Sequence, residues 1–278
     1  MSHDPINDLE SLSDVVRTFE LRTTKVLGQN FLLDLNLTRR IARSSGLLAG
    51  RTVIEIGPGP GGLTRALLLE GAAKVIAIEK DPRCVAALAP LVDAAEGRLE
   101  VREEDALTLQ LESLVTGTTK IVANLPYNIA TPLIMNWLPH LHLLESMTVM
   151  VQKEVAERFE AEPRTKAYGR VSVLAQWHAA VHTLFDLAPH VFWPPPKVTS
   201  SVVSFVPHKA PPYDANPEAL DTLLRHAFAH RRKVLRANLR PLHEDSAALL
   251  ASLGLSQNAR AEELTLENFC ALSRLLQQ

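Results

Sequence analysis

The feature that most constrains the fold is a regular alternation of short apolar runs with helical stretches in the N-terminal half of the chain. The β-prone runs lie at 52–56, 75–79, 99–102, 120–123 and 147–152, and the helical stretches lie near 62–70, 82–95, 107–115 and 130–143. Short buried strands that alternate with helices are typical of βαβ units around a mostly parallel sheet. The pattern therefore predicts an α/β domain, and apolar runs at 171–177 and 200–206 are expected to add further strands.

Beyond residue 207 the pattern changes from strands to helices. Pro211 and Pro212 indicate a linker, and helices are expected near 216–229, 231–241, 244–252 and 265–277. We therefore expect an N-terminal lead-in at 1–24 with a short helix around 12–21, an α/β domain at 25–207 and a smaller, all-helical domain at 208–278. Asp34 is the expected N-cap of a helix that follows a loop at 25–33.

Composition narrows the class of protein. The chain is 46% hydrophobic, with 29 basic and 31 acidic residues, which excludes bulk disorder. No apolar run reaches the roughly 18 residues that a membrane-spanning helix needs, and the acidic, polar start does not resemble a secretory signal. Cys84 and Cys270 lie far apart, and the ten histidines show no metal-ligand spacing. We expect a cytoplasmic, monomeric protein with no membrane or metal partner.

A glycine-rich turn follows the first strand of the α/β pattern, at 55–62. Its glycines fit G-x-G-x-x-G, the dinucleotide-binding fingerprint, and Glu55 with the following glycines equally fits the E-x-G-x-G-x-G pattern of S-adenosylmethionine-dependent methyltransferases. Glu79 ends the next strand, at the distance where an acid accepts hydrogen bonds from ribose hydroxyls. Both cofactors contain adenosine, so Glu79 does not separate the two interpretations.

Polar residues at the next two strand ends favour methyl transfer. Asp105, at the end of the third strand, could accept a hydrogen bond from the adenine amino group of a bound nucleoside. The fourth strand ends in Asn124, Leu125, Pro126 and Tyr127. The exocyclic nitrogen of adenine is a poor nucleophile because its lone pair is delocalised into the ring. An amide oxygen and a backbone carbonyl could accept its two hydrogens, a proline would stiffen the loop, and stacking on a tyrosine ring is worth about 1–3 kcal/mol.

Taken together, several segments resemble the ribosomal RNA adenine N6,N6-dimethyltransferase family over residues 25 to 240. These segments are GQNFL (28–32), EIGPGPGGLT (55–64), EDAL (104–107), NLPYNIATPL (124–133), QKEVAERF (152–159), YGRVSVLAQ (168–176), FWPPPKVTSSVV (192–203) and AFAHRRKVLRANL (227–239), together with Glu79. Within the family they are most similar to the bacterial branch that dimethylates two adjacent adenosines near the 3′ end of 16S rRNA. The resemblance implies a Rossmann-like class I methyltransferase sheet and S-adenosylmethionine as cofactor, with S-adenosylhomocysteine as its product. It also implies 16S rRNA in the immature small ribosomal subunit as partner.

The resemblance also assigns site residues. It makes Asn124 to Tyr127 the catalytic loop and Phe192 a second wall on which the target base stacks. One position departs from the family pattern, since Leu27 stands where an aromatic residue is usual. The expected cofactor contacts are Gln29, Asn30, Leu32, Glu55, Gly57, Gly59, Glu79, Lys80, Asp105, Ala106 and Asn124.

A basic strip near the C-terminus has two possible interpretations. Between residues 225 and 240 there is no acidic residue. In a helix, four apolar residues would share one face: Leu224, Phe228, Leu235 and Leu239. The adjacent cations could bind RNA phosphates or could form an ordinary solvated face. The candidate RNA-binding residues are Arg225, Arg231, Arg232, Lys233, Arg236 and Arg240.

Three other functions remain open from the sequence. The related large-subunit rRNA enzyme that confers macrolide resistance is weakened by NLPY in place of NIPY and by the HRRKVLRANL segment. An RNA-binding assembly factor could dock on immature subunits with or without methylation. A nucleotide-dependent oxidoreductase has no evident use for the Asn-Leu-Pro-Tyr loop.

Overall fold

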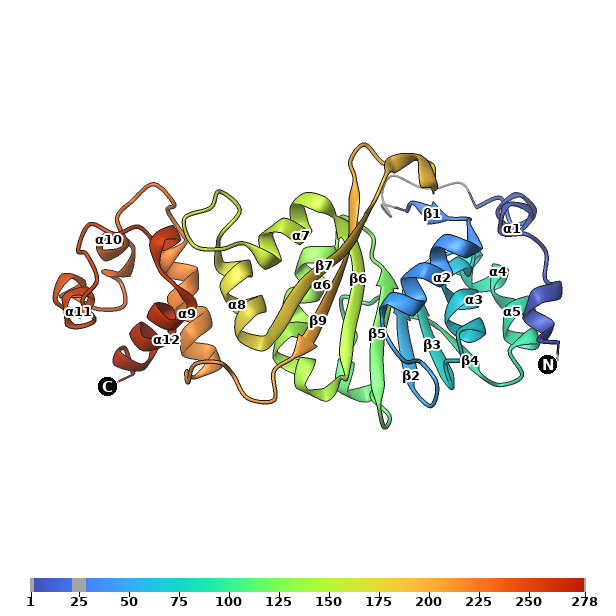
Figure 1. The fold of residues 1–278 in the computed structure, drawn as a ribbon, viewed down its shortest axis with the longest axis horizontal. Coiled ribbons are helices and arrows are strands. Elements are labelled where there is room, and N and C mark those ends of the chain that lie inside the picture. Colours follow the sequence, from blue (N-terminus) through green and yellow to red (C-terminus); the bar gives the residue numbers. More distant parts are fainter. Residues whose placement is uncertain (1–2, 22–28, 278) are drawn as a thin grey trace. The chain divides into compact units, whose positions relative to one another are not determined.

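The computed structural model describes residues 3–21 and 29–277 and confirms the α/β fold. Its main sheet has seven strands in the order β4-β3-β2-β5-β6-β9-β7 (Figure 1). Neighbouring strands from β4 to β6 are parallel, and β9 joins β6 antiparallel. The strands are β2 (Thr52–Ile56), β3 (Lys74–Glu79), β4 (Leu99–Glu103), β5 (Thr119–Asn124), β6 (Ser146–Gln152), β7 (Ala179–Leu187) and β9 (Ser200–Pro207).

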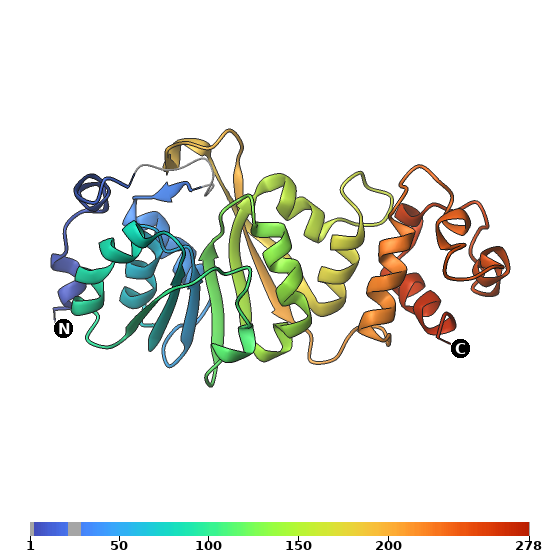
Figure 2. The same ribbon diagram turned by 180° about the vertical axis from the view of Figure 1, so that it is seen from behind.

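Helices cover both faces of this sheet. Helix α2 (Leu35–Ser44) lies in front of the sheet in Figure 1, and α6 (Ala130–Trp137) lies in front of it in the reverse view of Figure 2. The Asp34 side chain accepts hydrogen bonds from the first turn of α2, which confirms it as the N-cap. The other helices of this region are α1 (Leu12–Thr18), α3 (Gly62–Leu69), α4 (Pro82–Ala87), α5 (Ala89–Ala94) and α7 (Lys153–Glu160).

The central strands are buried on both faces. Val53 and Ile54 on β2, and Ile121 and Val122 on β5, have no exposed surface. Strands covered by helices on both sides read as continuous apolar runs, which explains why the sequence pattern located them. The register aligns their carboxyl ends, so the residues that follow β2, β3, β4 and β5 lie along one edge of the sheet.

One predicted strand is a helix. Residues 171–177 belong to α8 (Arg170–His178), and the strand that completes the sheet, β7, follows it. The helix starts where the Gly169 N–H donates to the Ser172 hydroxyl at 3.0 Å. Val173, Leu174 and Trp177 are buried, and a short apolar run of this kind does not distinguish a buried helix from a buried strand by periodicity.

Several predicted helices are shorter than expected. The stretch at 107–115 contains only a 3₁₀ turn, Leu111–Ser113, and the stretch at 82–95 divides into α4 and α5. The stretch at 130–143 is α6 followed by the 3₁₀ helix Leu138–Leu143. Near the C-terminus, the helix expected at 231–241 is shortened to α10 (Leu235–Leu239), which a non-helical segment separates from α9 (Pro217–Ala227).

The chain forms two compact units. The first consists of Met1–Ala156 and His182–Pro207, and the second of Glu157–Val181 and His208–Gln278. The chain passes from the first unit to the second after residue 207, at the expected boundary. The segment 157–181 was expected in the α/β domain, but it packs with the C-terminal helices instead. Besides α8, α9 and α10, the second unit contains α11 (Ser246–Ser252) and α12 (Leu266–Leu275).

The second unit has its own apolar core. Leu220, Leu223 and Leu224 of α9 have no exposed surface, and neither have Phe269 and Leu272 of α12, against which α9 packs. Among the helices described, none has the length and apolar content needed to cross a bilayer.

Candidate active site

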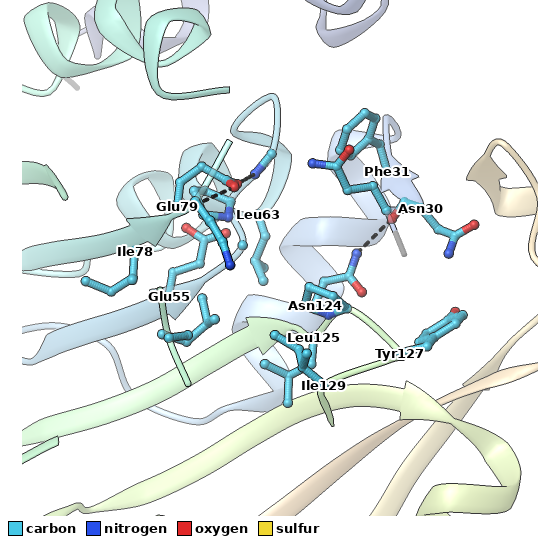
Figure 3. Close-up of a pocket in the computed structure, with 18 of the residues that line it drawn as sticks. Asn30, Phe31, Glu55, Leu63, Ile78, Glu79, Asn124, Leu125, Tyr127 and Ile129 are labelled. Carbon is cyan, nitrogen blue, oxygen red and sulfur yellow. Dashed lines mark hydrogen bonds between the residues drawn. The ribbon is translucent and has the colours of Figure 1, made fainter. Parts of the chain in front are cut away.

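A cavity of about 220 Å³ opens at the carboxyl edge of the sheet, where open α/β folds bind ligands (Figure 3). Every residue expected to contact the cofactor lines this cavity, and so do the four residues of the Asn124–Tyr127 loop. The structure thus brings together side chains that are spread over a hundred positions of sequence. The lining includes further residues that the sequence did not single out, Phe31, Ile56, Leu63, Ile78, Glu104, Leu107, Asn128 and Ile129.

The glycine-rich turn passes close to Phe31 and Leu32. Gly59 has φ of +55°, and a Cβ there would lie 2.8 Å from the Phe31 ring. A Cβ on Gly62 would lie 2.5 Å from the carbonyl oxygen of Leu32. These glycines therefore let the segment 31–32 close over the turn, leaving the backbone of the turn as part of the cavity wall.

Glu79 holds the turn at the end of β3. One of its carboxylate oxygens accepts a hydrogen bond from the Gly59 N–H at 3.1 Å, and the other accepts from the N–H groups of Lys80 and Asp81, each at 2.8 Å. Burial raises the pKa of Glu79, and these backbone donors oppose that shift. The carboxylate is thereby fixed in the cavity wall (Figure 3).

Glu55 is a buried carboxyl with one unsatisfied oxygen. Its side chain is 1% exposed, and its Oε2 has no hydrogen-bond partner among the described residues. Desolvation raises its pKa to about 8. The Thr64 hydroxyl opposes this rise in pKa, and the carboxyl group lies in the cavity wall, where it can accept a hydrogen bond from a donor that enters the cavity.

Asp105 and Lys80 form an ion pair at the rim of the cavity. The Lys80 Nζ lies 2.7 Å from Asp105 Oδ2, and Asp105 Oδ1 accepts a hydrogen bond from the Leu107 N–H. The hydrogen bond from Lys80 lowers the pKa of Asp105. Asp105 is therefore ionised at neutral pH and can act as an acceptor.

Asn124 connects the loop at 124–127 to the N-terminal segment at Asn30. Its Nδ2 donates to the carbonyl oxygen of Asn30 at 3.1 Å (Figure 3). With the amide nitrogen oriented in this way, Oδ1 is available as a hydrogen-bond acceptor. Next to it, the Leu125 N–H donates to the Met150 carbonyl, which fixes the loop on β6.

Tyr127 is held by its hydroxyl group. The Tyr127 oxygen lies 2.5 Å from the Ser200 Oγ on β9. Burial raises the pKa of the phenol, so it stays protonated at neutral pH. Because its far end is fixed, the ring is a rigid part of the cavity wall.

Phe192, the expected second stacking wall, lies in the apolar core, and its role in stacking stays a prediction. It is 4% exposed, packs in the apolar core and is absent from the cavity lining. The cause is strand pairing: β8 (Phe192–Trp193) runs antiparallel to β1 (Phe31–Leu32), with Phe192 opposite Leu32. Alternation along the strand turns Phe192 inward and leaves Trp193 44% exposed, stacked on Phe31 at 6.5 Å between ring centroids.

The basic residues near the C-terminus fall into two groups. Arg225 is paired with Asp221, and Arg231 with Glu262. The break between α9 and α10 removes the continuous basic face that the sequence predicted. The other four, Arg232, Lys233, Arg236 and Arg240, are exposed and have no side-chain partner within the described residues.

The described residues contain no group of histidine, cysteine or carboxylate side chains that could hold a metal ion.

Comparison with known proteins identifies the family. The model of the ribosomal RNA adenine dimethylase family matches residues 20–278. A "Ribosomal RNA small subunit methyltransferase A" of Xanthobacter autotrophicus is 53% identical over 98% of this chain and 96% of its own, and the Paracoccus denitrificans protein of the same name is 50% identical over 97% and 96%.

Two solved structures are also similar. A dimethyladenosine transferase from Plasmodium falciparum aligns with a TM-score of 0.72 and 27% identity, covering 86% of this chain and 94% of that one. The 23S rRNA methyltransferase ErmE aligns with a TM-score of 0.67 and 26% identity, covering 90% and 100%. With its cavity at the strand ends and a family match over nearly its whole length, this chain belongs to the ribosomal RNA adenine dimethylase family.

Proposed function

We propose that this protein transfers methyl groups from S-adenosylmethionine to the N6 atoms of two adjacent adenosines near the 3′ end of 16S rRNA. The product is N6,N6-dimethyladenosine, formed in the immature small ribosomal subunit in the cytoplasm. The observation that carries the proposal is the Asn124–Tyr127 loop, which lies beside the glycine turn, Glu79 and Asp105 in one cavity. Relatives at about half identity, named for the small subunit, favour this substrate over the 23S rRNA of the more distant ErmE.

The residues of the cavity fit the cofactor. The unpaired oxygen of Glu55 suits the ammonium group of the methionine portion, and the carboxylate of Glu79 suits the ribose hydroxyls. Asp105, which lines the same cavity, would accept a hydrogen bond from the adenine amino group, and the turn at Gly59 presents backbone without a side chain. When bound, S-adenosylmethionine supplies an electrophilic methyl group.

The catalytic loop would act on the target adenine by orientation. The Oδ1 of Asn124 and the carbonyl of Leu125 accept the two hydrogens of the exocyclic amine, which favours the pyramidal geometry of a nucleophilic nitrogen. The Tyr127 ring supplies a stacking surface that offsets part of the few kcal/mol needed to extrude a base. No strong base is required, because the nitrogen loses its proton readily once it is methylated. Positioning can supply roughly 7–11 kcal/mol of the barrier.

The second unit would bind the RNA backbone. Arg232, Lys233, Arg236 and Arg240 are exposed cations that can approach phosphates. Arg225 and Arg231, which the sequence placed in the same set, already have carboxylate partners. We expect the enzyme to act as a monomer on the immature subunit.

The direct test is methyl transfer to defined substrates. Unmethylated small subunits and large-subunit rRNA are incubated in parallel with labelled S-adenosylmethionine, and the RNA is digested to nucleosides for mass spectrometry. The expected result is dimethyladenosine in 16S rRNA only. Label confined to the large-subunit RNA would identify the resistance enzyme, and cofactor binding without label in either RNA would favour an assembly factor.

A further inference from the structure

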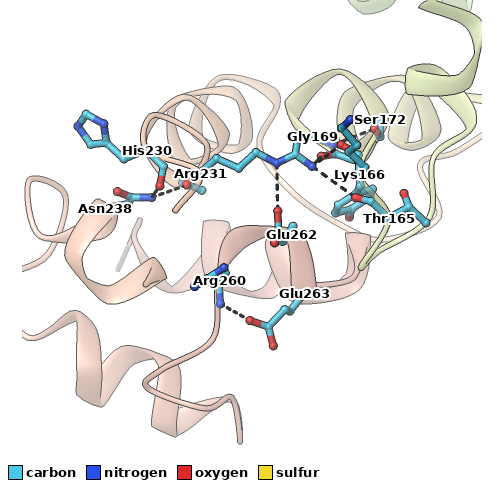
Figure 4. Close-up of polar contacts among 12 residues, drawn as sticks. Thr165, Lys166, Gly169, Ser172, His230, Arg231, Asn238, Arg260, Glu262 and Glu263 are labelled. Carbon is cyan, nitrogen blue, oxygen red and sulfur yellow. Dashed lines mark hydrogen bonds and ion pairs between the residues drawn. The ribbon is translucent and has the colours of Figure 1, made fainter. Parts of the chain in front are cut away.

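Arg231 joins two segments of the second unit that are far apart in sequence. It lies in the turn between α9 and α10, and its Nε donates to Glu262 at 3.0 Å (Figure 4). A terminal nitrogen of the same guanidinium donates to backbone carbonyls of the loop between α7 and α8, those of Lys166 and Tyr168. Arg231 is exposed, but its guanidinium is already hydrogen-bonded to a carboxylate and to backbone carbonyls of this protein. We therefore expect it to hold the two segments together rather than to bind a partner.

The loop between α7 and α8 is fixed at further points. The Arg164 N–H donates to the Glu262 carbonyl at 2.7 Å, and the Tyr168 hydroxyl donates to the Leu264 carbonyl at 2.9 Å. Tyr168 is 1% exposed, and its ring meets the edge of Phe228 at the start of the turn. The loop and the turn therefore lie side by side with little freedom to separate (Figure 4).

Charged side chains project from both segments. Arg164 and Lys166 of the loop are exposed, as are Arg232 and Lys233 of the turn, and none of the four has a side-chain partner in the described part of the chain. The nearby acid Glu262 is neutralised by Arg231. Glu162, exposed at the start of the loop, is the remaining acid of the segment 162–168. The exposed charges of the two segments are therefore mostly positive, which suits a phosphate backbone.

We propose that Arg164, Lys166, Arg232 and Lys233 form one phosphate-binding strip, and that Arg231 positions this strip without touching RNA. The proposal rests on the proposed function and extends it, because the sequence assigned no RNA contact to the loop at 162–168 and assigned Arg231 to direct binding. Two segments separated by more than sixty residues would thus act as one surface.

The first test measures how RNA affinity depends on salt. Binding of the R164Q/K166Q variant to unmethylated 16S rRNA is compared with wild type and with K209Q, from low to moderate salt. Lys209 is a matched control: it is an exposed lysine of the same unit, and its neighbour His208 bonds to His178 at the far end of α8. Affinity falls as salt rises, and each lost phosphate contact should make the slope of log affinity against log salt less steep by about 0.7–0.9. K209Q should keep the wild-type slope, and equal slopes for R164Q/K166Q and K209Q would overturn the proposal.

The second test separates positioning from contact by keeping the charge. R231K retains the positive charge but cannot serve Glu262 and several carbonyls together, so RNA affinity should fall several-fold. R232K keeps a point charge that can still meet a phosphate, so it should bind almost as wild type. Equal affinity of R231K and wild type would overturn the positioning role, and circular dichroism establishes that each variant is folded.

The two proposals fail in distinguishable ways. Wild-type protein that binds 16S rRNA without methylating it would refute the proposed function and leave the strip open to both tests. Protein that methylates small subunits while R164Q/K166Q binds like K209Q would refute the strip alone. Wild-type protein that binds no 16S rRNA would refute both.

Discussion

At the scale of single residues, the site depends on polar atoms that the fold orients or leaves unpaired. The hydrogen bond from Asn124 to the Asn30 carbonyl orients the amide, and the Tyr127–Ser200 contact fixes a ring. Glu55 is different, since one of its oxygens has no partner among the described residues. A buried polar atom without a partner lowers stability, so both kinds of group mark this cavity as the expected ligand site.

Replacing Asn124 by alanine should affect turnover more than binding. The N124A variant loses the acceptor that orients the target amine, and misplacement of a reacting group can cost about 10² in rate. We expect kcat to fall by about that factor while affinity for 16S rRNA changes less than about twofold, because the RNA backbone is bound elsewhere. Single-turnover methylation and equilibrium RNA binding measure the two quantities. A kcat within threefold of wild type would show that Asn124 does not orient the target amine.

The pKa of Glu55 predicts a stability effect in the ligand-free protein. Burial raises this pKa from 4.5 to about 8, so the folded protein keeps a proton that the unfolded chain has released. The contribution to stability is complete below pH 4.5 and is lost as the pH rises to about 8. The free energy of unfolding should fall by up to about 1.4 kcal/mol per pH unit from this group, and E55Q should remove that part. Urea unfolding of both proteins between pH 5 and 8 tests this, and parallel curves would contradict it.

At the scale of elements, close packing of the turn after β2 shapes one wall of the cavity. Gly59 lies against Phe31 of β1, and Gly62 against the Leu32 carbonyl, so the two-residue strand and the turn must move together. The short ladder between β1 and β8 then decides which aromatic residue faces outward. β1 and β8 form a two-stranded sheet of their own, separate from the seven-stranded sheet.

Replacing Gly59 by alanine should weaken both stability and cofactor binding. The new methyl group would meet the Phe31 ring, and a positive φ costs about 1–3 kcal/mol for a non-glycine residue. Gly71 supplies a control, because its φ is +94° but a Cβ there meets nothing within 4 Å. Both G59A and G71A should therefore lower the melting temperature, and only G59A should lose affinity for S-adenosylmethionine in calorimetric titration. Equal cofactor affinity for the two variants would show that the Phe31 contact is irrelevant to the site.

At the scale of the whole molecule, the chain divides in a way that linear order hides. Residues 157–181 leave the α/β unit, pack with the C-terminal helices, and the chain then returns to complete the sheet. Tyr168 and Trp177 are the anchors: the Tyr168 hydroxyl donates to the Leu264 carbonyl, and the Trp177 indole donates to the Tyr213 carbonyl. The second unit therefore cannot be removed by cutting the chain once.

A chain that ends at residue 207 should be defective although it contains the whole sheet. Truncation strips buried Tyr168 and Trp177 of their hydrogen-bond acceptors and exposes the apolar side chains of α8. We expect increased binding of a hydrophobic dye, a lower melting temperature and loss of amide-exchange protection in residues 170–178. Wild-type protection of that helix in the truncated chain would show that it needs no partner from the C-terminal region.

Local sequence signals predicted the sheet and most of the candidate site. The glycine turn, Glu79, Asp105 and the Asn124 loop each follow a buried strand, and parallel strands bring such ends to one edge. Each signal is short and depends on neighbours a few residues away. The site residues could therefore be located before the fold was known, although their roles remain predictions.

Other features were decided by contacts between distant segments. Residues 171–177 form a helix because α9 and α12 pack against it, and Phe192 is buried because β8 pairs with β1. Arg231 links two segments because the fold brings Glu262 and the Lys166 carbonyl within hydrogen-bond distance of its guanidinium. Hydrophobic periodicity and short motifs indicate which local conformations a chain favours. Which side of a strand is covered, and which cation finds a partner, depends on long-range packing, because burial and hydrogen bonding are properties of the assembled structure.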